Sequence, residues 1–287
     1  MPPVFPESLY RKARRIGRVI NGISLISPTL AGKMTYKLMC LPRHRPFKSV
    51  DKAFLDTAET SYLFCAETRI CVYHWDNPTL PDAPKILLAH GWESHSGRWR
   101  DYVPALHDAG YSVVAFDAPA HGNSDGKILN GILYGRAITS IVAQIGPLHA
   151  IIGHSMGGTA ALIGLTRTNM IPPKKVIIMG APTNIQRITD ELCALFALSA
   201  TAISATYAHI AAFAGRPLTD LILHNNVHNL GHVAAFIMHD TDDDVAPVAE
   251  GRLLAANWPG ATYLETKGFG HRFLPPDQAI KEVISRL

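Results

Sequence analysis

Short apolar runs rich in β-branched residues alternate along most of this chain with longer segments whose apolar positions recur at helical spacing. Runs that are apolar at almost every position predict strands buried on both faces, as in a parallel sheet covered by helices. An antiparallel hairpin, formed by residues 61–65 and 69–73, is expected at one edge of this sheet. The sequence therefore predicts an α/β fold with a mostly parallel central sheet. The predicted strands span residues 85–89, 111–116, 148–152, 176–179, 233–238 and 261–264, and the predicted helices span 98–109, 130–145, 157–168 and 276–286.

The turn after the run 148–152 carries a serine between two glycines. Its sequence is Gly153-His154-Ser155-Met156-Gly157, a G-x-S-x-G motif. Small residues at both ends of the motif allow a sharp bend, so that the serine is exposed on a strained turn. Because a strand-like run precedes the motif and a helix-like run follows it, we interpret Ser155 as a nucleophile. The alternative is an ordinary strand–helix turn that happens to contain a serine.

A serine hydroxyl is a weak nucleophile at neutral pH, so it needs a base, and the base needs an orienting acid. The run 233–238 ends in an aspartate-rich segment, residues 239–247, and the run 261–264 leads into Gly268-Phe269-Gly270-His271. Catalytic groups of α/β sheets lie on loops at the carboxyl ends of strands. An acid after one strand and a histidine after the next fit this rule.

With these motifs the chain resembles the α/β-hydrolase superfamily. In that family the three groups follow one another as serine, acid and histidine, and the acid commonly lies in a G-x-x-D-x-x-x-P pattern. Asp240, Asp243 and Pro247 stand at the glycine, acid and proline places of that pattern. The resemblance therefore implies Asp243 as the acid, and Asp242 and Asp244 are the neighbours that could be confused with it.

The final loop of the family often carries a Gly-His pair, which Gly270-His271 matches, so the resemblance implies His271 as the base. The similarity extends from about residue 62 to the C-terminus, which is most of the chain. It implies the α/β-hydrolase fold, with helices flanking the sheet and a helical cap inserted between two late strands.

The strand–helix alternation is interrupted between residues 183 and 232, where a cap is commonly inserted. Two apolar segments, 192–198 and 203–213, predict helices there. Because these helices carry few charges, they must bury two faces. We expect them to line an acyl pocket, and the alternative is a packing element without substrate contact. The predicted organisation is a basic N-terminal segment of residues 1–50, a core formed by 51–182 and 233–287, and a cap of residues 183–232.

Acyl transfer to a serine also requires donors for the developing oxyanion. The resemblance implies that one donor is the backbone N–H of Met156, directly after the nucleophile. The second is expected from Trp92, in the loop that begins His90-Gly91 after the strand 85–89. Gly91 allows the backbone to approach the substrate closely. The expected substrate-binding residues are His90, Gly91 and His154, with His90 as a hydrogen-bonding residue rather than a base.

Positive charge is concentrated at the N-terminus. Residues 1–50 hold ten Lys or Arg against one acid, Glu7, a net charge of +9, whereas residues 51–287 hold 17 basic and 22 acidic residues, a net charge of −5. Within the first 20 residues, apolar positions recur at helical spacing, and arginines occupy the opposite face of the predicted helix. Such a helix can lie on an anionic membrane or dock on a partner, and the alternative is a helix packed on the body with its arginines in water. Its apolar positions are Leu9, Ala13, Ile16 and Ile20.

The cysteines and histidines add little chemistry. The four cysteines show no C-x-x-C spacing; Cys65 and Cys71 could face each other across the hairpin, but buried free thiols in a reducing compartment are expected. Residues His224, His228 and His232 would share a face only on an uninterrupted helix, which the nearby asparagines and glycine disfavour, so no metal site is expected. We expect a cytoplasmic protein, with possible peripheral membrane contact through the basic helix. Nucleic acid is excluded as a partner, because the basic cluster lacks a recognised fold and interleaved aromatics.

The sequence therefore predicts a serine hydrolase that cleaves a carboxylic ester or thioester, with a hydrophobic acyl group, through an acyl-enzyme on Ser155. It needs no cofactor, and its partner is a small-molecule substrate. The alternatives are a non-catalytic ligand-binding protein of the same fold, and another chemistry of the family, such as carbon–carbon hydrolysis or peptide cleavage. The natural substrate and the oligomeric state do not follow from the sequence.

Overall fold

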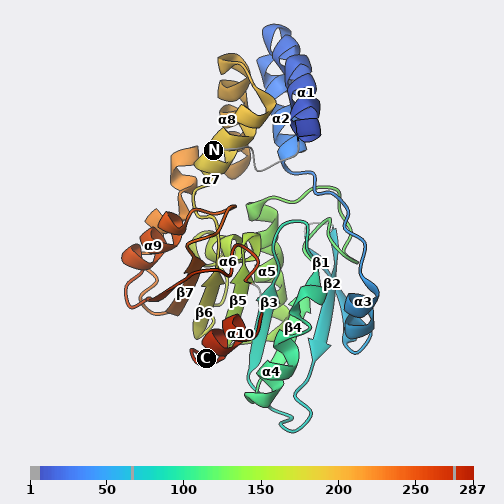
Figure 1. Ribbon diagram of the computed structural model, residues 1–287, viewed down its shortest axis with the longest axis vertical. Coiled ribbons are helices and arrows are strands. Elements are labelled where there is room, and N and C mark those ends of the chain that lie inside the picture. Colours follow the sequence, from blue (N-terminus) through green and yellow to red (C-terminus); the bar gives the residue numbers. More distant parts are fainter. Residues whose placement is uncertain (1–6, 66–67, 274–275) are drawn as a thin grey trace. The chain divides into compact units, whose positions relative to one another are not determined.

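The computed structural model describes residues 7–65, 68–273 and 276–287, and the chain forms two compact units (Figure 1). The helical unit combines Met1–Leu41 with Asn184–Leu223, and the core unit combines Pro42–Thr183 with His224–Leu287. Most of the predicted N-terminal segment 1–50 and of the predicted cap 183–232 thus belongs to one unit, whereas residues 42–50, 183 and 224–232 belong to the core unit.

The core unit is built on an eight-stranded sheet with the order β1-β2-β4-β3-β5-β6-β7-β8. The first two strands form an antiparallel hairpin at the edge, β2 also pairs antiparallel with β4, and every further pairing is parallel. The prediction of a mostly parallel sheet with an edge hairpin is confirmed. The strands are β1 (Glu59–Cys65), β2 (Thr68–Trp75), β3 (Lys85–Ala89), β4 (Ser112–Phe116), β5 (Ala150–His154), β6 (Lys175–Met179), β7 (Ala234–Asp240) and β8 (Thr262–Thr266).

Helices cover both faces of this sheet. On one face α5 packs against α6, and on the other α4 packs against α10, with Tyr102, Phe236 and Ile280 in a shared apolar core. The central strands β4 and β5 are buried at every position, as expected of parallel strands between two helical layers. The helices of this unit are α3 (Ser49–Leu55), α4 (Tyr102–Asp108), α5 (Gly131–Ile145), α6 (Met156–Arg167), α9 (Val248–Asn257) and α10 (Pro276–Ile284), and the 3-10 helices are η1 (Ser96–Trp99) and η3 (Leu223–Asn225).

The predicted helix 98–109 is two elements, η1 and α4. Pro104 lies in the first turn of α4, where the missing N–H has no partner to lose. In a continuous helix over 98–109 this proline would lie in the interior and remove a hydrogen bond. The start of α4 at Tyr102 avoids that loss.

The cysteines of the hairpin do not face each other. In the β1–β2 register Cys65 pairs with Thr68, and Cys71 pairs with Tyr62. All four cysteines are buried free thiols, as the sequence analysis expected.

Four helices form the helical unit: α1 (Glu7–Ile26), α2 (Pro28–Met39), α7 (Ile185–Phe196) and α8 (Ala200–Ala214), followed by the 3-10 helix η2 (Leu218–Leu221). Side-chain caps define where three of them begin, because Ser27, Asn184 and Ser199 each accept a backbone N–H of the first turn. None of the described helices is both long and apolar enough to span a bilayer.

The apolar face predicted for the N-terminal helix is covered inside this unit. Ala13 and Ile20 are buried, and Ile16 packs against the cluster that contains Ile20, Ala31 and Ala202. The arginines on the opposite face of α1 are exposed. The side chain of Leu9 lies outside the described residues.

Close helix approach in this unit depends on glycine. A Cβ on Gly17 would collide with the backbone of Phe196, and one on Gly32 would lie 2.5 Å from the carbonyl carbon of Ala205. A Cβ on Gly22, in contrast, would meet nothing within 4 Å. The pairs α1–α7 and α2–α8 can therefore pack this closely only because residues 17 and 32 are glycines.

Substituting two helical glycines separates packing from helix propensity. Gly32→Ala should lower the free energy of unfolding by about 1–3 kcal/mol, because the methyl group forces α2 and α8 apart. Gly22→Ala, the matched control, should raise it by roughly 0.5–1 kcal/mol through lower chain entropy in the unfolded state. Hydrogen exchange of the four helices measures both. Equal effects of the two substitutions would contradict the close packing.

Candidate functional site

Ser155 lies between β5 and α6 in a strained conformation. Its φ of 52° and ψ of −123° are unusual for a residue with a side chain. The flanking glycines permit this turn: a Cβ on Gly153 would lie 2.6 Å from Gly158 Cα, and one on Gly157 would collide with the carbonyl of Ala89. The backbone N–H of Ser155 donates to Met179 O at 2.8 Å, which ties the turn to the neighbouring strand.

The structure brings Ser155, His271 and Asp243 together. His271 Nε2 lies 2.9 Å from Ser155 Oγ, and His271 Nδ1 lies 2.8 Å and 3.0 Å from the two carboxylate oxygens of Asp243. The three residues follow β5, β7 and β8, so they meet at the carboxyl edge of the sheet. With Nδ1–H donating to the carboxylate, Nε2 is left to accept the serine proton.

The Asp243 carboxylate is fully enclosed and surrounded by donors. Its Oδ1 accepts the N–H groups of Val245 and Ala246 at 2.9 and 2.8 Å, and a second buried histidine, His239, lies 3.4 Å from Oδ2. Burial alone would raise the pKa of Asp243, but the hydrogen bonds from His239 and His271 outweigh it and hold the pKa below its usual value. The carboxylate is therefore ionised at neutral pH.

The other aspartates of this segment have different surroundings. Asp242 and Asp244 are exposed, and Asp242 accepts the N–H of Gly268. Asp240, at the glycine place of the family pattern, is buried and accepts from the hydroxyl of Thr266 and the N–H of Phe269. Asp240 therefore clamps the loop that carries His271.

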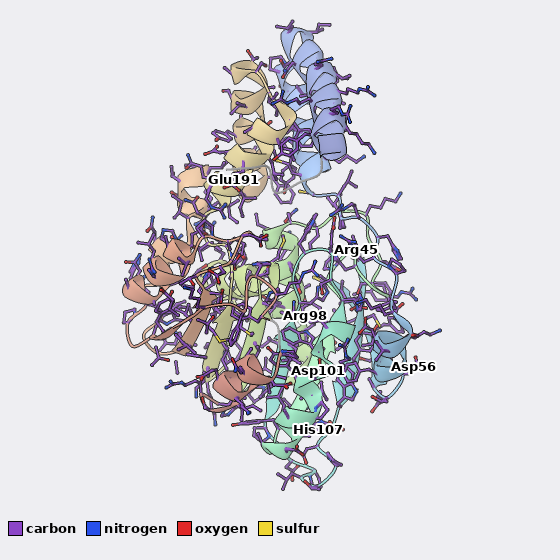
Figure 2. All side chains as sticks on the ribbon, in the orientation of Figure 1. Arg45, Asp56, Arg98, Asp101, His107 and Glu191 are labelled. Carbon is purple, nitrogen blue, oxygen red and sulfur yellow. The ribbon has the colours of Figure 1, made fainter. Side chains whose placement is uncertain are left out.

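A half-buried arginine that no sequence motif predicted also reaches this loop. Arg98, labelled in Figure 2, places one guanidinium nitrogen 2.5 Å from His154 Nδ1, and His154 Nε2 lies 2.7 Å from the carbonyl oxygen of His271. Burial, followed by the charge of Arg98, lowers the pKa of His154 well below its usual value. The neutral imidazole thus accepts from Arg98 and donates to His271.

Arg98 itself has unusual surroundings. Burial lowers its pKa to about 10, so it stays charged at neutral pH. Its guanidinium lies 4.9 Å from the ring centroid of Trp99, and within the described residues its Nε has no hydrogen-bond partner. No local motif marks Arg98; only the fold brings η1 beside the end of β5.

His90 has the hydrogen-bonding role expected of it, and His154 has a similar one. His90 is fully buried, its Nδ1–H donates to Gly91 O at 2.8 Å, and its Nε2 accepts the N–H of Ala118 at 2.9 Å. His154 is likewise occupied at both ring nitrogens. Neither imidazole has a nitrogen left for a substrate, so the predicted substrate contact does not fit, and both position the backbone instead.

Gly91, Trp92 and Met156 lie around the serine turn. A Cβ on Gly91 would be 3.1 Å from Ser155 Cβ, so the backbone there passes directly over the nucleophile. Met156 is the first residue of α6, and its N–H has no carbonyl to meet inside the helix. Among the described residues, neither this N–H nor that of Trp92 has a protein partner.

The three histidines of the insertion do not share a helical face. His224 lies in η3 and its Nδ1 lies 2.7 Å from the hydroxyl of Thr183, whereas His228 and His232 lie in turns. The described residues contain no group of three side chains that could hold a metal ion.

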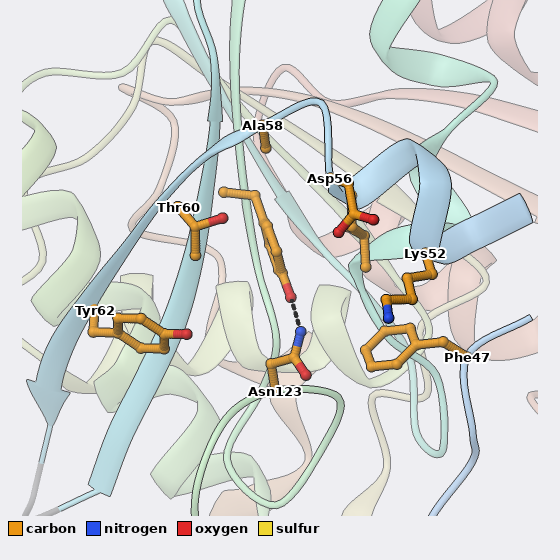
Figure 3. A pocket seen from close by; sticks show the side chains of 9 residues that line it. Phe47, Lys52, Asp56, Ala58, Thr60, Tyr62 and Asn123 are labelled. Atoms are coloured by element: carbon orange, nitrogen blue, oxygen red, sulfur yellow. Dashed lines mark hydrogen bonds between the residues drawn. The ribbon is translucent and has the colours of Figure 1, made fainter. Parts of the chain in front are cut away.

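A cavity of about 500 Å³ in the core unit does not include the serine (Figure 3). The hydroxyl of Tyr73 donates to Asp117 at 2.9 Å and accepts from the Asn123 amide at 2.8 Å, the bond drawn in the figure. These polar groups are hydrogen-bonded to one another, and they hold in place the loop that carries Asn123. It is lined by Phe47, Lys52, Leu55, Asp56, Ala58, Thr60, Tyr62, Tyr73 and Asn123.

Fold and site together define an α/β-hydrolase. The family model described as serine aminopeptidase, S33, matches residues 81–227, just over half of the chain. The protein belongs to this family of the α/β-hydrolase superfamily.

Known proteins similar to the chain include esterases and lipases. It is 32% identical over 117 residues to a pimeloyl-acyl-carrier-protein methyl ester esterase of Neisseria meningitidis, a match covering 40% of the chain and 43% of that protein. It is 26% identical over 130 residues to monoglyceride lipase of Homo sapiens, covering 42% and 40%. The chain thus spans about two fifths of the length of these relatives. An esterase of Pyrococcus furiosus shares the fold, with a TM-score of 0.62 at 18% identity over 86% of the chain and 98% of that structure.

The depressed pKa of Asp243 makes part of the stability depend on pH. Because the folded-state pKa lies below the unfolded value, the stabilisation is present above about pH 4 and is lost as the pH falls through the folded-state pKa. Asp243→Asn should therefore lower the unfolding temperature at pH 7, and the gap to the unsubstituted protein should narrow below about pH 4. Asp244→Asn, at an exposed position, is the control. A gap that stays constant with pH would argue against this electrostatic origin.

The Arg98–His154–His271 chain can be tested by labelling. Arg98→Met should slow the reaction of Ser155 with a fluorophosphonate by about 10–100-fold, because the His271 backbone loses its anchor. Free guanidinium should restore part of the rate, and Arg98→Lys should fall between. Arg252→Met, which removes an exposed arginine paired with Glu265, is the matched control. If the variant labels more slowly, is also less stable to heat, and is not rescued by guanidinium, Arg98 has a merely structural role.

Proposed function

We propose that the protein is a serine hydrolase that cleaves carboxylic esters through an acyl-enzyme on Ser155. The observation that carries this proposal is the unbroken hydrogen-bond chain from Ser155 Oγ through His271 to the enclosed carboxylate of Asp243. The strained φ of Ser155 supports it, since such conformations persist where function requires them.

The proposed reaction has two halves. His271 Nε2 takes the proton of Ser155 as Oγ attacks the ester carbonyl, and Asp243 stabilises the resulting imidazolium. The N–H groups of Trp92 and Met156 bind the oxyanion. The intermediate collapses, the carbon–oxygen bond to the alcohol breaks, and His271 protonates the leaving alkoxide. Water, deprotonated by His271, then attacks the acyl-enzyme and releases the acid and Ser155.

The class of bond is inferred from two sources. The curated relatives with matches above are an ester hydrolase and a lipase, which favours oxygen esters. The family description names aminopeptidases, so peptide bonds are the competing substrate class. We further propose a hydrophobic acyl group, because Trp92, whose half-buried indole packs edge-on against His121, directly follows Gly91, whose backbone passes over Ser155.

Turnover of p-nitrophenyl esters of graded acyl length tests the proposal. Ser155→Ala should lower kcat/KM by roughly 10⁴-fold or more, because removing a triad nucleophile leaves only binding and oxyanion stabilisation. Ser285→Ala, at an exposed serine of the core unit, should have no effect. The acyl length with the highest kcat/KM indicates how long an acyl chain the pocket accepts.

Two results would contradict the proposal. One is ester turnover that survives Ser155→Ala. The other is the absence of both turnover and fluorophosphonate labelling in the unsubstituted protein, which would favour a ligand-binding protein. Hydrolysis confined to aminoacyl amides would keep the nucleophile and overturn the ester assignment.

A further inference from the structure

The turn between α1 and α2, the blue helices in Figure 1, exposes large aliphatic side chains to solvent according to their accessible surface. Leu25 is 83% exposed and Ile26 is 90% exposed, and Val19 and Leu30 on either side are 59% and 49% exposed. Single exposed aliphatics are ordinary on protein surfaces, but adjacent groups of them mark interaction sites. Ser27, between Ile26 and the first residue of α2, holds the turn by capping the second helix.

These are not the residues that the helical periodicity suggested. The apolar positions Ala13, Ile16 and Ile20 of α1 pack inside the helical unit. The face available for a partner is therefore the end of the α1–α2 pair, and its apolar residues fall outside the i, i+3, i+4 pattern of the buried face.

The same helix pair is strongly basic. Its residues 7–41 hold seven Lys or Arg and one acid, Glu7, a net charge of +6. Arg18 precedes Ile26 by eight residues, about 12 Å along the helix, and Lys33 follows Leu30 by three, about 5 Å. Both side chains are exposed. At physiological salt the Debye length is about 8 Å, so Lys33 lies within one Debye length of Leu30, and Arg18 lies about one and a half Debye lengths from Ile26. Charge and apolar contact can therefore act on one surface.

We propose that the α1–α2 turn docks on an anionic lipid surface. Leu25, Ile26 and Leu30 enter the boundary between headgroups and acyl chains, and Arg18 and Lys33 bind lipid phosphates or carboxylates. A second copy of this chain is the poorer occupant, because docking through the same turn brings two surfaces of net charge +6 together. The proposal goes beyond the ester hydrolysis proposed above and does not depend on it.

Co-sedimentation of the full chain with vesicles tests this docking. The protein should bind vesicles containing phosphatidylserine, bind pure phosphatidylcholine vesicles at least about tenfold more weakly, and dissociate as salt rises. The triple change Leu25→Ser, Ile26→Ser and Leu30→Ser should reduce binding about tenfold or more. Arg18→Glu with Lys33→Glu should reduce binding to the anionic vesicles only.

A control alters three exposed aliphatics of the core unit. Leu80→Ser, Ile171→Ser and Leu253→Ser change residues that are 48%, 53% and 47% exposed, and should leave vesicle binding unchanged. Unchanged circular dichroism and thermal unfolding show that each variant is folded. Ester turnover in solution is a separate readout, so a failure of docking and a failure of the proposed catalysis are distinguishable.

Three outcomes would overturn the proposal. The unsubstituted protein fails to bind anionic vesicles, or the apolar triple variant binds as well as the unsubstituted protein. In the third, sedimentation velocity detects a dimer of the unsubstituted protein and only a monomer of the triple variant. This result would assign the turn to a second copy of the chain.

Discussion

The site depends on keeping one buried carboxylate ionised. An enclosed Asp243 without partners would take up a proton, because burial disfavours its charged form. Two backbone N–H groups and the imidazole of His271 supply the compensating hydrogen bonds, and His239 Nε2, which donates to Ala246 O, also lies 3.4 Å from the carboxylate. Satisfying this carboxylate fixes the loop after β7 and the ring orientation of His271 at once. Hydrogen-bond satisfaction of a single side chain therefore sets the geometry of the nucleophile's partner.

His271 is held from two directions. Its side chain is oriented by Asp243, and its backbone carbonyl accepts from His154, whose other nitrogen is held by Arg98. A histidine that accepts and later returns a proton must keep its ring within hydrogen-bond reach of both serine and substrate. Two anchors on opposite sides of the residue restrict the loop more than the acid alone could. Because its pKa is lowered, His154 stays neutral and adds no positive charge beside His271.

The fold and the order of the motifs could be predicted because both are encoded locally. Apolar runs give the strands, and the G-x-S-x-G turn needs only residues close in the chain. Arg98 and His239 could not be predicted, since their roles come from contacts that the folded sheet creates: Arg98 lies 56 residues from His154. The substrate contact of His154 was predicted from its place in the motif, which says nothing of where the ring points. The joining of the two helical segments depends likewise on packing partners far away in sequence.

The N-terminal helix shows why amphipathicity alone does not identify a surface. A stripe of apolar residues with arginines opposite suits a membrane, a partner or the protein's own interior equally well. Here Gly17 and Gly32 allow α7 and α8 to approach closely enough to cover the stripe. Once it is covered, the arginines no longer flank an open apolar face, and the exposed aliphatics near them are Val19 and those at the turn after the helix. A basic surface is thus paired with apolar residues that no periodicity within α1 connects to it.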